Sequence, residues 1–185
     1  VLLLLTFIQS SVSADVGWAN SWAFLGSTNN VVPSMQYPGT LYAGSDSGFY
    51  RSLNEGVCWE LMASGDFKYI LVSETAPEII IAGSGNQVVR VSENRGDSWQ
   101  ELMISTSQSV RCTGGCFYPG ESLCCYLSTA NGIYKIWKQD EHWVTPIRIH
   151  PLMHLTTPWI DLHIIQDDYT EIYACCPNMG LVTLR

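Results

Sequence analysis

Short runs of alternating apolar and polar residues recur along the chain and predict β-strands. Thr40–Gly44 is followed by a polar turn and a second run, Gly48–Ser52, in which Phe49 and Arg51 alternate. A period of two is the pattern of a half-buried strand. Counterparts of both runs return at 79–83 with 88–92, 124–128 with 132–136, and 171–175 with 180–184. No segment has sustained helical periodicity, so the sequence predicts an all-β fold.

Each repeat also has an apolar run before this pair of strands, and the first three have another after it. The first runs are 31–32, 69–72, 110–112 and 159–165, and the last runs are 59–62, 99–103 and 143–145. Four strands in repeats of 40 to 48 residues are the signature of antiparallel β-propeller blades. The predicted propeller domain is 15–185, with blades at 31–63, 67–104, 109–147 and 159–185, the last completed by 17–25. About four blades are visible, and both a four-bladed ring and a fragment of a larger ring stay open.

An octet of the form Ser-x-Asn-x-Gly-x-x-Trp connects the third and fourth strands of the first two repeats. Its copies are Ser52–Trp59 and Ser92–Trp99. Asn can hydrogen-bond the backbone two residues on, Gly supplies a positive φ, and Trp buries a large ring. The structural positions are therefore Ser52, Asn54, Gly56, Trp59, Ser92, Asn94, Gly96 and Trp99. A degenerate third copy, Ile136–Trp143, keeps only Asp140, out of register, and Trp143.

The octets resemble the Asp-box, or BNR repeat, of sialidases, sortilin-type receptors and photosystem II assembly factors. The usual box has Asp where this chain has Asn54 and Asn94. The resemblance covers most of the chain and implies a β-propeller whose boxes lie on the rim, away from the ligand-binding face. Sialidases of this family open on a Phe/Tyr-Arg-Ile-Pro segment, which is missing here. Arg148-Ile149-His150-Pro151 has the wrong order and place, so the resemblance does not extend to sialidase activity.

The net charge limits the kinds of partner that the chain could bind, and the N-terminal pattern indicates its cellular compartment. The net charge is −8, and an acidic chain is a poor candidate for binding nucleic-acid phosphates. The apolar run Val1–Ile8 is too short to span a membrane, and no other apolar stretch approaches spanning length. Val12-Ser13-Ala14 has the form of a signal-peptidase site, which predicts a signal peptide at 1–14 and a secreted protein.

Seven cysteines in a secreted chain suggest disulfides. Cys112 and Cys116 could close a small loop across a Gly-Gly turn. Either Cys124 or Cys125 could pair with either Cys175 or Cys176, because the two pairs fall on equivalent strands of neighbouring repeats. No metal or cofactor is expected, since the cysteines lack zinc spacing and His150 and His154 flank a proline without a supporting carboxylate pattern.

The residues expected to bind a ligand lie in the turns between second and third strands. These turns carry Asp46, Asn86, Asn131 and Asn178, beside Asp66, Lys68 and Ser107 from the connecting loops. Turns also select Asn and Asp for conformation alone. The function predicted is that of a secreted, non-catalytic propeller that binds a protein or a glycan. A glycan-active hydrolase using carboxylates such as Glu74 or Asp161, and an assembly or sorting factor, are the alternatives.

Overall fold

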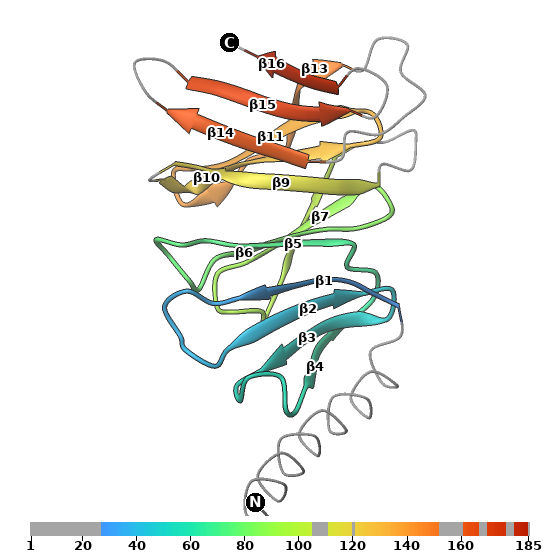
Figure 1. Ribbon diagram of the computed structural model, residues 1–185, viewed down its shortest axis with the longest axis vertical. Coiled ribbons are helices and arrows are strands. Elements are labelled where there is room, and N and C mark those ends of the chain that lie inside the picture. Colours follow the sequence, from blue (N-terminus) through green and yellow to red (C-terminus); the bar gives the residue numbers. More distant parts are fainter. Residues whose placement is uncertain are drawn as a thin grey trace, which may run out of the picture.

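The strands form four antiparallel sheets that follow one another in chain order (Figure 1). The computed structural model describes residues 27–104, 111–119, 121–151, 161–166, 170–176 and 180–184, and all regular structure within them is β. This confirms the predicted fold class. The segments 1–14 and 17–25, Ser107, His154 and Asn178 lie outside the described residues.

The first two sheets are meanders in which each strand pairs with the next one along the chain. The first sheet consists of β1 (Thr28–Pro33), β2 (Leu41–Ser45), β3 (Gly48–Ser52) and β4 (Glu60–Ser64). The second consists of β5 (Tyr69–Val72), β6 (Ile80–Gly83), β7 (Val88–Ser92) and β8 (Gln100–Met103). An octet joins the third and fourth strands of each sheet, as the sequence predicts.

The third sheet has a broken outer strand. Its elements are β9 (Cys112–Tyr118), β10 (Glu121–Thr129), β11 (Gly132–Gln139), β12 (His142–Trp143) and β13 (Ile147–Pro151). β12 pairs with the end of β11 and β13 pairs with its beginning. Pro146 lies between them, and a proline has no N–H to contribute to a ladder. The sheet therefore extends to Pro151, past the predicted blade end at 147. The fourth sheet is formed by β14 (Asp161–Gln166), β15 (Thr170–Cys176) and β16 (Gly180–Leu184).

One local prediction for the third sheet is wrong, and the degenerate octet does not form the turn of the other two. The segment around Gly114 and Gly115 is not a turn but the middle of β9. A Cβ at Gly115 would lie 2.6 Å from a Leu127 side-chain atom, so glycine serves a close strand contact. The degenerate octet is instead a two-residue hairpin, because β11 runs on to Gln139 and Asp140 and Glu141 both have positive φ, 49° and 65°.

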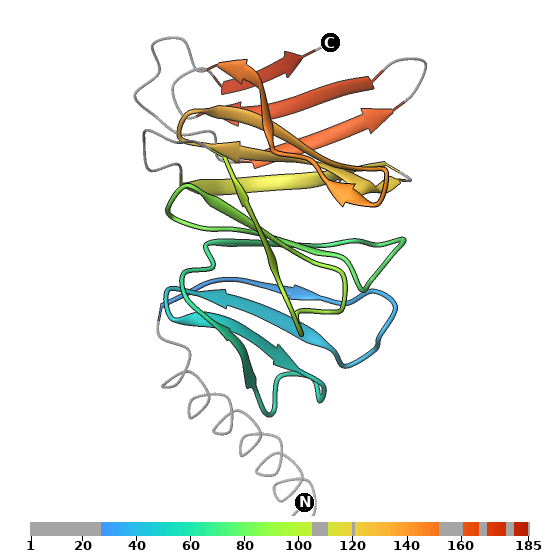
Figure 2. The same ribbon diagram turned by 180° about the vertical axis from the view of Figure 1, so that it is seen from behind.

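Hydrophobic clusters join each sheet to the next, so the sheets stack face to face (Figure 2). Phe49 and Ile80 share one cluster between the first two sheets, and Val91 and Leu127 share the next. The first strands are neighbours in series, β5 lying against β1 and β9, and β9 against β14. First strands that line one side of a stack of blades define the inner side of a propeller. The first and fourth sheets lie at opposite ends of the stack, which makes it a partial β-propeller.

Candidate functional site

The two octets fold into the same turn, built around a buried serine hydroxyl. Ser92 Oγ accepts the N–H of Gly96 at 2.8 Å and donates to Asn94 Oδ1 at 3.0 Å. Asn94 Oδ1 in turn accepts the N–H of Ser98 at 2.9 Å. Ser52, Asn54, Gly56 and Cys58 repeat these contacts at 2.8 to 3.0 Å. The side-chain oxygen of each Asn is therefore a hydrogen-bond acceptor inside the turn. Glu55 and Arg95, next to the two glycines, adopt positive φ.

The second octet also packs against the first sheet. Trp99 donates from Nε1 to Gly96 O at 3.1 Å and meets Phe49 edge-on, with ring centroids 4.9 Å apart. The ring centroid of Phe67 lies 5.3 Å from that of Trp99. Arg51 donates to Asp97 Oδ1 at 2.8 Å across the same boundary. The octet is thus a contact between blades as well as a turn within one.

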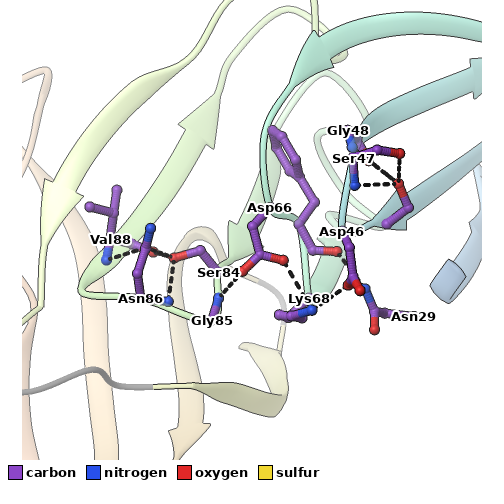
Figure 3. A network of polar contacts seen from close by, with 12 residues as sticks. Asn29, Asp46, Ser47, Gly48, Asp66, Lys68, Ser84, Gly85, Asn86 and Val88 are labelled. Atoms are coloured by element: carbon purple, nitrogen blue, oxygen red, sulfur yellow. Dashed lines mark hydrogen bonds and ion pairs between the residues drawn. The ribbon is translucent and has the colours of Figure 1, made fainter. Parts of the chain in front are cut away.

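The predicted site residues Asp46 and Asp66 come together through Lys68 (Figure 3). Lys68 Nζ forms an ion pair with Asp46, which follows β2, and lies 3.2 Å from Asp66 Oδ1 in the connection between β4 and β5. Asn29 donates to Asp46 at 3.0 Å. The Gly85 N–H, in the turn of the second sheet, donates to Asp66 Oδ2 at 2.7 Å. This polar network fastens the first two sheets together at one edge.

The charges in this network stabilise each other. The hydrogen bond from Lys68 lowers the pKa of Asp46, and a further bond from Asn29 acts in the same direction. The hydrogen bond to Asp46 raises the pKa of Lys68, although partial burial of the ammonium opposes the rise. At neutral pH the charged forms of Lys68 and Asp46 therefore favour each other at the boundary between the first two sheets.

Asn86 and Asn131 each form a hydrogen bond within their own turns. Asn86 Oδ1 accepts a hydrogen bond from Ser84 Oγ and one from the Val88 N–H at 3.3 Å. The Asn131 N–H donates to Thr129 Oγ1 at 3.1 Å. A repeated signal was missed: in the first three sheets, the second strand ends at, or is followed by, a buried hydroxyl that bridges the turn. These hydroxyls belong to Ser45, Ser84 and Thr129.

A pocket of about 380 Å³ lies on the inner side of the stack, between β5, β9 and β14. Leu71, Phe117 and Ile164 give it an apolar lining, and Glu74, Tyr118 and His163 add polar groups. Gln36, in the loop between β1 and β2, donates to the Glu74 carbonyl at 2.7 Å, and Tyr69 OH donates to Gly115 O at 3.3 Å. The second, third and fourth sheets therefore line this pocket, and a loop of the first sheet holds part of its rim.

The pocket and the predicted site lie toward opposite edges of the sheets. The loop from β5 to β6, which carries Glu74, lies at the edge of the octets, since the Arg95 N–H donates to Glu78 O at 2.9 Å. Asp46 and Asn86 lie in turns at the other edge, because successive strands are antiparallel. Sequence reasoning named Glu74 only as an available carboxylate and missed Phe117 and Tyr118. What Phe117 and Tyr118 share is their position at the end of β9, the first strand of the third sheet.

Contrary to the expected disulfides, the described cysteines are thiols. They are Cys58, Cys112, Cys116, Cys124, Cys125 and Cys175. Cys112 and Cys116 lie four residues apart on one extended strand, roughly 13 Å at about 3.3 Å per residue, beyond the reach of a disulfide. Burial raises the pKa of the Cys112 thiol to about 12 and that of Cys125 well above its usual value. Cys175 is exposed, whereas Cys124 and Cys125 are buried, and the side chain of Cys176 lies outside the described part.

The described part of the chain shows neither a membrane-crossing helix nor a metal cluster. No helix there is long and apolar enough to cross a bilayer. No three His, Cys, Asp or Glu side chains in the same residues gather where they could hold a metal ion.

Solved structures similar to this chain are β-propeller proteins. An ancestral GH74 enzyme has a TM-score of 0.62 and 16% identity, over 85% of this chain and 25% of that one. YCF48 bound to a D1 peptide has a TM-score of 0.54 and 17% identity, over 85% of this chain and 50% of that one. The extracellular domain of the one-component system BT4673 of B. thetaiotaomicron has a TM-score of 0.60 and 12% identity, over 87% of this chain and 21% of that one.

These likenesses establish the fold and leave the activity open. The chain spans between a fifth and a half of the length of these neighbours. No protein-family model matches the sequence, and no curated protein matches it. The class of protein is therefore a partial β-propeller, whose neighbours include an enzyme, a peptide-bound protein and an extracellular domain of a one-component system.

Proposed function

We propose that this chain is a non-catalytic propeller of the Asp-box type that binds a protein partner, and that a peptide segment of the partner enters the pocket between β5, β9 and β14. The composition of the pocket carries this proposal. Its apolar side suits the side chains of a peptide, and its few polar groups suit the fixing of orientation. The identical contacts inside the two octets support assignment to the Asp-box type.

The same lining favours binding over glycoside hydrolysis. Most glycosidases act with two carboxyl groups about 5 to 9.5 Å apart. Among the described residues, Glu74 supplies the only carboxylate that lines the pocket. Asp46 and Asp66, outside the pocket, form a pair of acids, but Lys68 lies between them. A neighbour of the same fold, YCF48, is bound to a peptide, which is consistent with this type of ligand.

We infer that the protein acts in the secretory pathway or outside the cell. The signal-peptide pattern at 1–14 supports this location, and one structural neighbour is an extracellular domain. N-terminal sequencing of the chain after secretion from a host cell should begin at Asp15.

The binding proposal can be tested with a random-sequence peptide library displayed on phage, screened beside a glycan array. Peptides selected on the parent chain should bind at least about tenfold more weakly to Glu74→Gln and His163→Ala, because a hydrogen bond to a charged group contributes about 1.5–3 kcal/mol. Both side chains are exposed, so these variants should keep the fold. Glu78→Gln and His142→Ala, exposed residues outside the pocket, are the matched controls.

A variant with alanine at Asp46, Asn131 and Asn178 tests the originally predicted turns as the ligand site. It should leave peptide binding unchanged. Loss of binding in this variant alone would overturn the pocket and support the turns. Selection of glycans without peptides, or of no ligand, would overturn the peptide assignment.

A further inference from the structure

Glu74 lies on a well-anchored loop at the pocket between β5, β9 and β14. Its carbonyl accepts a hydrogen bond from Gln36 at 2.7 Å, and the N–H of the preceding residue, Ser73, donates to Ile79 O at 3.0 Å. The Ser73 hydroxyl also accepts the N–H of Ala76 at 3.1 Å. These contacts order the backbone of the loop in advance, so a partner that meets the Glu74 carboxylate does not have to order this backbone first.

The Glu74 carboxylate is the isolated charge of the pocket. Among the described residues that line the pocket, Glu74 is the only Asp, Glu, Lys or Arg. Its side chain is exposed and forms neither an ion pair nor a hydrogen bond within the described part of the chain. Carboxylates at the sheet boundaries differ, because Asp97 pairs with Arg51 and Glu93 pairs with Lys138. The described part of the chain thus supplies a counter-charge to those carboxylates but not to Glu74.

The rest of the lining suits the stem of a basic side chain. Lys and Arg have long apolar stems that pack on apolar surface while the charged end reaches a polar partner. Leu71, Phe117 and Ile164 give the pocket an apolar surface of this kind beside Glu74. The net charge of the chain is −8, which favours the approach of cationic partners. The lining and the charge therefore select the same class of side chain.

We propose that the peptide bound in this pocket carries a lysine or arginine, whose charge pairs with Glu74 and whose stem packs against the apolar lining. This inference rests on the proposed function and adds the chemistry of the partner. Charge pairs at an interface act strongly on the choice of partner, because a like charge at the same place is repelled. Glu74 is therefore the residue that makes the pocket prefer basic peptides over acidic ones.

A double-mutant cycle tests this ion pair with peptides selected from a random-sequence library on the parent chain. Lysine or arginine should be enriched at one position of these peptides. Replacing that residue with glutamine should weaken binding to the parent at least about tenfold, but binding to Glu74→Gln by less than about twofold, because that variant has no charge to pair. Glu78→Gln, at an exposed carboxylate of the same loop that does not line the pocket, is the matched control and should keep the tenfold loss.

Charge reversal gives a readout that a purely structural role of Glu74 would not produce. Selection of the same library on Glu74→Lys should enrich aspartate or glutamate in place of the basic residue. Selection on Glu78→Lys should still return basic peptides, because this substitution changes the net charge equally but lies outside the pocket.

The outcomes separate this inference from the proposed function. Peptides that lose binding in His163→Ala but have no enriched basic residue would overturn the inference and leave the peptide pocket in place. Basic peptides that bind Glu74→Gln as tightly as the parent would show attraction to the acidic surface in general, and would overturn it as well. A library that yields no binding peptide would contradict the proposed function itself, and this inference with it.

Discussion

Gly96 is the residue at which the second octet touches the neighbouring sheet. Its φ is 89°, which is strained for any residue with a side chain, and an added Cβ would lie 2.3 Å from Phe49 Cε1. Gly39 has a similar φ of 81°, but an added Cβ there would meet nothing closer than 3.6 Å. The two glycines thus separate the cost of backbone strain from that of a steric clash.

Gly96→Ala should destabilise the chain by roughly 2–5 kcal/mol, the sum of left-handed strain and overpacking against Phe49. Gly39→Ala should lose only about 1–2 kcal/mol, because strain acts alone there. Urea denaturation of both variants measures the difference. Equal losses would show that Phe49 does not constrain Gly96.

At the scale of the element, the octet depends on the hydroxyl of its serine. Ser92 is 1% exposed and satisfies the N–H groups of Gly96 and Asn94. Ser92→Ala should therefore cost about 1–3 kcal/mol, since buried donors lose their acceptor. Asn94→Asp, which restores the usual box residue, should change stability by less than about 1 kcal/mol, because the acceptor oxygen is kept. Chemical denaturation checks both, and an Asp variant as damaging as the Ala variant would contradict this account of the turn.

Elements defined by local alternation were predictable, and elements defined by neighbours were not. The strands at 69–72 and 88–92 were predicted with the bounds that the structure gives them. The Gly114–Gly115 segment was not, because a glycine pair gives the same signal in a turn and in a strand packed against Leu127. Only the structure showed which of the two applied.

The candidate site was predictable only in part, for a related reason. Asp46 was named from turn chemistry and Asp66 and Lys68 from a connecting loop, and the two aspartates do approach each other through Lys68. The pocket at Glu74, Phe117 and His163 was not found, since its lining comes from three sheets and no local pattern joins them. Assembly of distant segments requires the stacking of the sheets, which the alternation does not specify.

At the scale of the whole molecule, ion pairs fasten one sheet to the next. Lys68 links to Asp46 of the first sheet, and Lys138 of the third sheet lies 2.8 Å from Glu93 of the second octet. Hydrogen bonds from the lysines lower the pKa values of Asp46 and Glu93. A carboxylate whose folded pKa is depressed stabilises the fold above its unfolded pKa, and this contribution is lost as the pH falls through the folded value.

The parent chain should therefore lose thermal stability as the pH falls below 4.5 and 3.8, the ordinary pKa values of Glu93 and Asp46, and through their lower folded values. Asp46→Asn and Glu93→Gln should each have a lower Tm than the parent at pH 6, and should lose less on acidification because one titrating contact is already absent. Both lysines have raised pKa values, so their contribution holds below the unfolded pKa of 10.5 and persists across this window. Glu78→Gln, at an exposed carboxylate without an ion pair among the described residues, is the control and should follow the parent. Melting curves of the four chains at several pH values measure the effect. If all four lose Tm in parallel, the contacts between sheets do not set the acid limit of this propeller.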